Sequence, residues 1–462
     1  PNGKDFFMNS HTLFTKTPPL KLFLFAAVPG AISMLASALY QLIDGILVGQ
    51  FLGETAFAAL NLAMPFVIIN FSLADLIGVG SSVPISIHLG RKEDEEANNI
   101  FSCACTMIVG TGILMGAILF SAAPLLIRLM GAQGEFAHLA VQYLRVYALC
   151  SPITTIVFAM DNYLRICGKI RNSMILNLFM SALSAALEFV FLFVFRWGIW
   201  GAALATCLGM CTCALLACIP FFRGKAQLRF RKPRFRFSMV KQILACGCPN
   251  FLNNIAGRVT SILMNVLLVR FGGESAVSIY GILMYVEGFI QPLLYGMCDS
   301  LQPAVGYNWG AGHNSRVRAI ERCCFLASAV LSVLAAVIIF LCPSQIARLF
   351  MQEAGPDFLT ATVGALQLFA FTYLTRWFSF ATQSYMLAIE KPVQASMISV
   401  STALVFPVVL IALLWTLGLT GLWLNFALTS ALAAVLAGVI LLRFQKNMKA
   451  REARRWESDP TV

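Results

Sequence analysis

The stretch LIDGILVGQFLGETA, residues 42–56, ends the first long apolar segment of the chain and holds a carboxylate, Asp44, inside that segment. Part of it returns 220 residues later, where FLGETA (51–56) aligns with FGGESA (271–276) without a gap. Self-similarity at a fixed offset is the mark of a duplicated structural unit. We therefore expect two halves of similar fold. The position of the Asp44 carboxylate inside an apolar segment requires a separate explanation.

The repeat extends along each half, because the same offset matches Pro29 with Pro249 and GIWG (198–201) with GLTG (418–421). Each half holds six apolar segments, and an even number returns the chain to the side on which it began. Halves that enter a membrane from the same side are related by an axis along the membrane normal. That arrangement is found among alternating-access carriers.

Composition places the chain in a membrane. Of its 462 residues, 59% are hydrophobic and 12% are charged, whereas soluble domains are roughly 25% charged. Many apolar runs exceed the ~20 residues that a helix needs to cross a bilayer. We predict an all-α membrane protein of twelve transmembrane helices in two six-helix lobes related by pseudo-two-fold symmetry. The predicted spans lie near 22–50, 56–87, 98–122, 136–163, 172–195, 198–221, 243–269, 276–305, 322–342, 359–388, 394–416 and 421–443.

The distribution of basic residues predicts the orientation. The inner segments of this scheme carry 26 of the 33 Lys and Arg residues and the outer loops carry four, and basic loops stay in the cytosol. The polar first residues lack a signal-peptide cleavage site. We therefore expect both termini to be cytosolic, in a bacterial cytoplasmic membrane. The domains would be an N-lobe (1–221), a basic cytosolic linker (222–242), a C-lobe (243–443) and a cytosolic tail (444–462).

The densest basic stretch is FRGKAQLRFRKPRFRF (222–237), which has seven Lys or Arg residues and no acid. It could bind lipid or nucleic acid. A linker that anchors the topology and touches anionic headgroups is the simpler interpretation. We expect the lipid bilayer as a partner and no nucleic acid. The 14 cysteines lie almost entirely in apolar segments, at spacings that suit neither zinc nor redox chemistry, so we interpret them as small hydrophobic residues.

Polar residues inside the spans predict the functional site, because a charge at the bilayer centre costs at least ~2.5–3.5 kcal/mol. Counted from the outer loops at ~1.5 Å per residue, Asp44, Glu188, Thr206 and Tyr143 all lie about 12–14 Å deep. Ser184 precedes Glu188 on the same helix face. We predict a coupling site for a proton or a cation, with Na⁺ possible at Asp44 and Glu188. Alternatively, each residue satisfies a separate helix contact.

The second half lacks this set of polar residues. The residues that lie 220 positions after Asp44, Ser184, Glu188 and Thr206 are Met264, Leu404, Val408 and Phe426. The predicted coupling site therefore belongs to the N-lobe alone.

The C-lobe has polar residues of its own. Arg258 and Glu287 lie near mid-membrane by the same counting, and they could pair with each other or contact a ligand. Gln291 and Asp299 continue the Glu287 face, and Arg376 adds a charge in the tenth span. We take Glu287, Arg258, Asp299 and Gln291 as candidate substrate contacts.

Four other residues have simpler interpretations. Asp161 and Arg165 are spaced as a local i, i+4 salt bridge. Asp75, in the second span, has no evident partner. Pro29 would bend the first span, either as a hinge or as a tolerated kink.

Three stretches resemble the multidrug and toxic compound extrusion (MATE) family of the polysaccharide-exporter (MOP) superfamily. They are LIDGILVGQFLGETAFAAL (42–60), LRICGKIRNSMILNLFMSALSAALEFVFLFVFRWGIWGAALAT (164–206) and SLQPAVGYNWGAG (300–312). Together with the repeat, the resemblance covers essentially the whole chain. It implies a cation-coupled antiporter, driven by H⁺ or Na⁺, that exports small organic compounds by alternating access. It also implies that the chain is not an enzyme.

The resemblance also assigns residues. Asp44 matches the family's first-span aspartate, Pro29 the proline that bends that helix, and Thr206 the threonine of the G-A-A-x-A-T segment. The family's fifth-span Asn and Asp are Ser184 and Glu188 here. Weaker oxygen ligation would favour H⁺ over Na⁺, although Na⁺ stays open. We therefore expect that Asp44 and Glu188 are retained in a buried site because they bind and release this ion.

Asp299 precedes the SLQP motif where the family tends to be neutral, which indicates a cationic substrate. Two other classes stay open. A flippase for lipid-linked oligosaccharides would favour a larger, more cationic cavity in both lobes. A membrane-embedded transferase lacks support, since the chain has no HExxH motif, no P-loop and no sizeable polar loop. We expect a monomer with no cofactor beyond the coupling ion.

Overall fold

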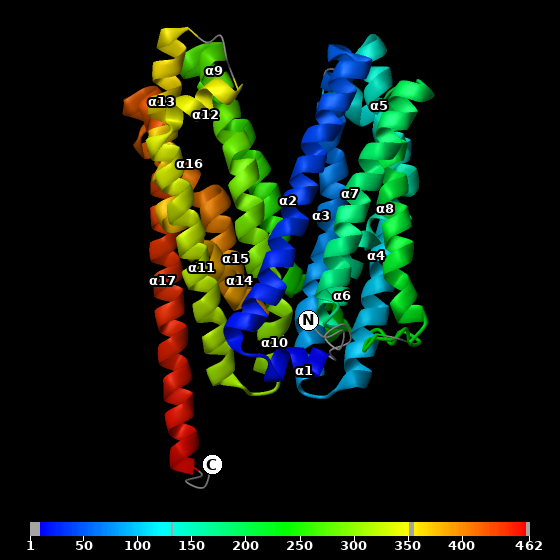
Figure 1. Ribbon diagram of the computed structural model, residues 1–462, viewed down its shortest axis with the longest axis vertical. Coiled ribbons are helices and arrows are strands. Elements are labelled where there is room, and N and C mark those ends of the chain that lie inside the picture. The colour runs from blue at the N-terminus through cyan, green and yellow to red at the C-terminus, as the bar shows by residue number, and fades with distance from the viewer. Residues whose placement is uncertain (1–9, 131–132, 225, 351–354, 459–462) are drawn as a thin grey trace. The chain divides into compact units, whose positions relative to one another are not determined.

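The computed structural model describes residues 10–130, 133–224, 226–350 and 355–458, and within these ranges every regular element is a helix (Figure 1). Twelve helical segments of this part of the chain are long and apolar enough to cross a membrane. The predicted all-α fold with twelve spans is confirmed. Most spans are longer than predicted, because the helices continue past their apolar cores into polar turns.

The first half contains six spans. Its fourth span consists of α5 and α6, and its fifth continues from α7 into a π-helical turn. The elements are α1 (Ser10–Lys16), α2 (Pro19–Leu52), α3 (Glu54–Gly90), α4 (Asp94–Leu129), α5 (Gly134–Thr154), α6 (Ile156–Ile166), α7 (Ile170–Phe189), η2 (Val190–Val194) and α8 (Ile199–Phe222).

The second half also contains six spans. Its longest element, α9, holds two of them, because Gly273 has non-helical φ and ψ angles and divides the helix. The elements are α9 (Phe237–Asp299), α10 (Gln302–Gly310), α11 (Asn314–Leu341), α12 (Pro343–Phe350), α13 (Pro356–Ala370), α14 (Thr372–Ala388), α15 (Pro392–Val400), η3 (Ser401–Val405), α16 (Phe406–Leu413), η4 (Trp415–Leu417) and α17 (Gly418–Ser458).

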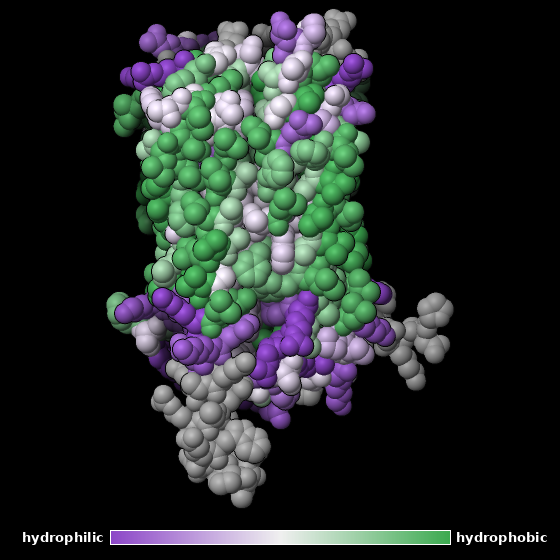
Figure 2. Space-filling view, turned by 90° about the vertical axis from the view of Figure 1, so that its left-hand side faces the viewer, coloured by the Kyte–Doolittle hydropathy of each residue, from purple (hydrophilic) through white to green (hydrophobic). Residues whose placement is uncertain are grey.

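The surface of the spans is apolar. Large hydrophobic side chains stand exposed on them, such as Leu114, Ile262 and Leu326. On the face drawn in Figure 2, hydrophobic residues form a broad band and hydrophilic residues gather at its two ends. Exposed apolar area of this extent would make a soluble protein aggregate. In a bilayer it faces the lipid chains.

Two compact units divide the chain. The first contains the described residues up to Phe251, with Tyr295–Cys323 and Ala388–Glu390. The second contains Leu252–Leu294, Cys324–Leu387 and the described residues from Lys391 onward. The lobe boundaries at 222–242 follow the sequence repeat and stay a prediction. All six spans of the first half lie within the first unit, and so do both ends of α9.

The repeat is also present in the backbone. Left-handed φ angles are unfavourable for residues other than glycine. Six residues with such angles fall into three pairs at the 220-residue offset found in the sequence. The pairs are Gly53 (φ 85°) with Gly273 (φ 63°), Gly198 (φ 74°) with Gly418 (φ 54°), and Lys92 (φ 63°) with Gly312 (φ 77°). Corresponding helices of the two halves are therefore joined by turns of the same hand.

Glycines allow backbones to touch inside the first unit. A methyl group on Gly90 of α3 would overlap the carbonyl oxygen of Tyr307 in α10, and one on Gly310 would overlap that of Ile87. The offset relates Gly90 to Gly310 and Ile87 to Tyr307, so the contact is reciprocal between the repeats. Close approach of this kind is how helices pack tightly in a membrane.

Gly247, near the start of α9, lies against the backbone of α3. A Cβ atom there would overlap the carbonyl oxygen of Leu76, which cannot move without shifting the helix. We expect Gly247→Ala to lower stability by about 1–3 kcal/mol, seen as a lower midpoint of thermal unfolding in detergent. Gly281→Ala is the control, because nothing lies within 4 Å of its new methyl group. Equal midpoints for the two variants would contradict this packing.

Candidate functional site

A cluster of polar side chains lies in the interior of the first unit. Asp44 comes from α2, Tyr143 from α5, Glu188 from α7 and Thr206 from α8, and all four are buried. Of these helices, α2 packs on α7 and α8, and α8 packs on α5 and α7, and Figure 1 shows α2, α7 and α8 side by side. The four residues that the sequence places at one depth therefore lie within one helix bundle.

Tyr40 of α2 connects the acids to α8. Its hydroxyl lies 2.5 Å from Thr206 Oγ1 and donates to Glu188 Oε2 at 3.5 Å. The carboxyl groups of Asp44 and Glu188 lie within interaction range of each other. The first and fifth spans thus present two acids to one site, and a phenol and a hydroxyl hold one oxygen of the pair in place.

Two tyrosines of α5 form the wall behind Asp44. The rings of Tyr143 and Tyr147 pack at 5.1 Å between centroids. Both phenols lie close enough to Asp44 to interact with it electrostatically, and Tyr147 also faces Thr206. Aromatic walls exclude water, which strengthens the interaction of the acids with any ion that enters.

Several buried polar atoms of this cluster lack hydrogen-bond partners among the described residues. A buried polar atom left unpaired costs about 1–3 kcal/mol, so several such atoms close together favour a position where an ion or water binds. The unpaired atoms are Asp44 Oδ1, Glu188 Oε1, Tyr143 Oη, Ser184 Oγ and Ser181 Oγ. All of them are oxygens, which suits a proton or a hard cation such as Na⁺. In the described part of the chain, no three His, Cys, Asp or Glu side chains converge as metal ligands.

The sequence of the fifth span sets the direction of these side chains. Ser184 and Glu188 are four residues apart and share a helix face, and both are almost fully buried. Ser184 points at Gly209 of α8, where any larger side chain would occupy its place. The π-helical turn η2 begins two residues after Glu188. Such turns are frequent at functional sites because they shift the register of the side chains.

Pro29 lies inside α2, which the structure describes as one continuous helix. Ser33 Oγ donates to the carbonyl oxygen of Pro29 at 2.8 Å, a bond of the kind that bends helices. A methyl group on Gly30 would overlap Gly296 and Ser300, at the end of α9. The proline therefore lies next to a close contact between α2 and the end of α9, and its role as a hinge stays a prediction.

Asp161 and Arg165 belong to a larger network than the local salt bridge that we predicted. Arg165 pairs with Asp161 at 2.7 Å and donates to Ser173 at 3.0 Å and Ser300 at 2.9 Å. Ser173 and Asn177 both donate to Asp161. The network ties α6 to α7 and to the residue after α9, with the guanidinium 4% exposed.

In the second unit, Glu287 pairs with a different arginine from the one we considered. Arg376 lies 2.6 Å from its carboxylate, and Tyr373 donates a hydrogen bond to it. Arg258 is exposed, so the pair between Arg258 and Glu287 does not form. The prediction of this pair used depth alone, and depth does not determine the direction in which a side chain points around its helix.

The remaining polar residues of the prediction are on α9 and α3. Gln291 is half-buried on α9. Asp299, at the end of α9, accepts a hydrogen bond of 2.8 Å from Gln302. Asp75 is half-buried on α3 and has no hydrogen bond or ion pair with another described residue.

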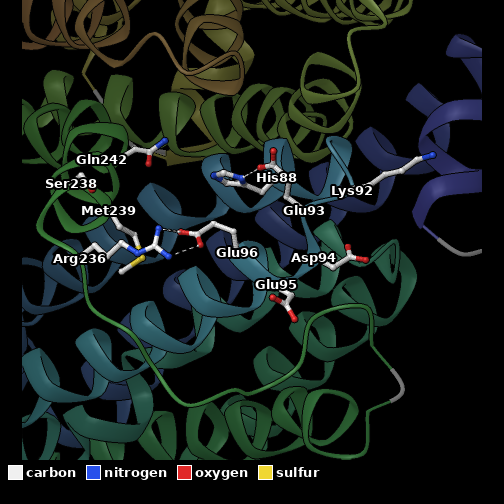
Figure 3. Close-up of a pocket in the computed structure, with 10 residues that line it drawn as sticks. All are labelled: His88, Lys92, Glu93, Asp94, Glu95, Glu96, Arg236, Ser238, Met239 and Gln242. Atoms are coloured by element: carbon white, nitrogen blue, oxygen red, sulfur yellow. Dashed lines mark hydrogen bonds and ion pairs between the residues drawn. The ribbon is translucent and has the colours of Figure 1, made fainter.

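A cavity of about 660 Å³ opens at the turn between α3 and α4 and the start of α9. Figure 3 shows Arg236 directed at Glu96 and His88 at Glu93 across this region. Its lining is largely charged, including Lys92 and Glu95. Exposed charges of this kind attract an ion only weakly. The cavity is therefore a weaker candidate site than the buried acids.

Sequence reasoning left two participants out of the site. Both lie on polar helix faces that the sequence shows: Tyr40 with Ser33, Ser37 and Asp44, and Tyr147 with Tyr143, Ser151 and Thr154. Counting depth alone did not select them. A tyrosine one turn from a buried acid is a signal that could have done so, because its hydroxyl reaches the neighbouring helix.

Comparisons with known proteins identify relatives of the whole chain. The MatE family profile matches residues 29–190 and 249–413. The multidrug export protein MepA of Staphylococcus aureus (strain MSSA476) is 23% identical over 432 residues, 93% of this chain and 94% of the relative. MepA of Staphylococcus saprophyticus is 27% identical over 349 residues, which cover 74% of this chain and 76% of the relative.

Solved structures share the fold. An outward-facing multidrug resistance MATE transporter of the MOP superfamily matches with a TM-score of 0.89 at 23% identity, over 96% of this chain and 99% of that one. A MOP superfamily transporter from Pyrococcus furiosus matches with a TM-score of 0.86 at 23% identity, over 93% and 96%. The reversed polarity of its binding pocket has been taken to suggest a different function.

Proposed function

Because this chain belongs to the MatE family of membrane transporters, we propose that it exports small organic cations, of more than one kind, in exchange for H⁺ or Na⁺. The relatives named multidrug export protein support the export of varied compounds. Asp44 and Glu188, here called the acidic cluster, support the exchange for a coupling ion.

One observation carries the proposal: two buried carboxyl groups from different spans lie together, and each has an oxygen without a partner. Two charged acids side by side away from water repel each other and lose their hydration. A bound proton or cation relieves both costs. Ser184 presents a hydroxyl where the family has an amide carbonyl. A neutral hydroxyl is a weaker oxygen ligand for a metal ion than an amide carbonyl, so the proposal favours H⁺.

In the proposed mechanism, Tyr40, whose hydroxyl is also bonded to Thr206, holds Glu188 Oε2 while Oε1 stays available to the ion. Pro29 has no N–H group, so α2 lacks one helical hydrogen bond there and can bend. Bending would move Asp44 on α2 relative to Glu188 on α7 and change the affinity for the ion. Coupling requires such a difference in affinity between the two states.

The substrate would be cationic because acids dominate the candidate sites. Glu287, Gln291 and Asp299 stay as candidate contacts for it. At Glu287 an organic cation would have to compete with Arg376, which already pairs with the carboxylate. Arg258 is left out of this proposal, because its side chain is exposed.

Purified protein in proteoliposomes tests the proposal, with a fluorescent organic cation inside and imposed gradients outside. We expect an inward H⁺ gradient to accelerate efflux of the dye without Na⁺. An effect of an inward Na⁺ gradient alone would assign Na⁺ as the ion. Efflux that responds to neither gradient would overturn the coupling, and no efflux together with flipping of a lipid-linked sugar would overturn the whole proposal.

A further inference from the structure

The segment 226–236, here called the strap, connects α8 to α9 and has a fixed backbone. Side chains at the start of α4 hold it by hydrogen bonds of 2.7–3.1 Å. The bonds are Arg229 N–H to Asn98 Oδ1, Arg231 N–H to Ser102 Oγ, Arg234 N–H to Asn99 Oδ1, and Asn99 Nδ2–H to the carbonyl of Arg234. These three α4 residues are buried.

Buried apolar side chains also hold the strap in place. Leu228 is fully buried, and the ring of Phe230 packs 4.8 Å from Phe101 of α4 and 4.6 Å from Phe222 of α8. A connection between two spans would ordinarily be mobile. Here its alternate residues are fixed inward, which turns the remaining side chains outward.

The outward side chains are basic and mostly unpaired. Arg229, Arg231, Lys232 and Arg234 are exposed, and none has a carboxylate partner within the described ranges. Arg236 is the exception, because it lies 3.3 Å from Glu96 (Figure 3). Four like charges on a fixed backbone repel one another, so an anion that approaches this surface lowers its electrostatic free energy.

Aromatic side chains flank the charges. Phe222 ends α8, and Phe237 begins α9; they are 72% and 86% exposed, and Phe235 is 53% exposed. Since both helices cross the membrane, these rings lie at its edge, where aromatic residues are enriched. A strand of nucleic acid would have to leave water to reach them. Phospholipid headgroups are already there.

We propose that the strap is a preformed site for anionic phospholipid headgroups of the adjoining leaflet. Its unpaired guanidinium and ammonium groups bind the phosphates, and its exposed phenylalanines enter the acyl-chain boundary. This proposal depends on membrane insertion and is independent of the transported substrate and of the coupling ion.

Native mass spectrometry of the full chain in neutral detergent tests the proposal, with phosphatidylglycerol and phosphatidylcholine titrated separately. We expect the protein to retain phosphatidylglycerol at least tenfold more tightly. The variant Arg231→Gln/Lys232→Gln/Arg234→Gln should lose about a hundredfold in that affinity. The control Lys21→Gln/Arg443→Gln/Lys446→Gln removes as many exposed charges elsewhere and should change it less than threefold.

A third variant separates a fixed site from a mere collection of charges. Asn99→Ala keeps every basic residue but removes both bonds to Arg234, and we expect it to bind phosphatidylglycerol several-fold less tightly. Three results would overturn the proposal: equal loss in the two triple variants, unchanged affinity in Asn99→Ala, or binding of duplex DNA or inorganic phosphate at concentrations where phosphatidylglycerol does not bind.

Discussion

Asp44→Asn should abolish ion-driven export while the folded protein stays in the membrane. The substitution keeps the size of the side chain but removes the group that takes up and releases the ion beside Glu188. Without it, the two states of the carrier no longer differ in ion affinity, and coupling requires that difference. We expect gradient-driven efflux of the dye from proteoliposomes to fall at least a hundredfold, to the rate measured with vesicles that contain no protein.

The matched control is Asp357→Asn, which removes an exposed acid at the start of α13. It should export at the normal rate. The elution profile and thermal midpoint of Asp44→Asn should match those of the unmodified protein or exceed them, because a buried acid is lost. Normal export by Asp44→Asn under a gradient would remove the acidic cluster from the mechanism.

Arg165→Met should cause the largest loss of stability. The change leaves the half-buried Asp161 without its cation and leaves Ser300 without the donor that links it to α6. Removing one partner of a buried ion pair costs about 3–5 kcal/mol. We expect a lower thermal midpoint of the detergent-solubilised protein and a smaller yield from membranes.

Two further variants assign the loss to the uncompensated charge. Asp161→Asn/Arg165→Met removes both charges, and we expect it to recover a large part of the stability, since the amide can still accept from Ser173 and Asn177. Arg318→Met, at an exposed position on α11, should have no effect. If the double variant unfolds as readily as Arg165→Met, lost packing and not the charge would be the cause.

The repeat and the twelve spans could be predicted because they depend on patterns that extend over many residues. Hydrophobic length decides whether a helix crosses a bilayer, and the offset recurs in sequence stretches such as FLGETA and FGGESA. The composition of the two units could not be predicted. It follows from contacts such as Gly90 with Tyr307, and a single sequence gives no signal for which glycines meet.

The grouping of polar side chains was only partly visible. Counting residues gives the depth of a side chain but not its direction around the helix axis, so it paired Glu287 with Arg258 when Arg376 is the partner. The same limit made Asp161 and Arg165 look local, since Ser300 is distant in sequence. At the acidic cluster depth and direction coincide, and there the predicted residues lie together.

The paired left-handed turns bear on the history of the chain. After a gene duplicates, most positions of the two copies drift apart, but a left-handed turn accepts few residues besides glycine. The positions of such turns therefore still align the two copies after most of their residues have come to differ. Lys92 opposite Gly312 is a departure, in which one half has glycine at the turn and the other has lysine. The turns therefore differ less between the two halves than the buried acids do, since Asp44 and Glu188 have no counterpart in the second half.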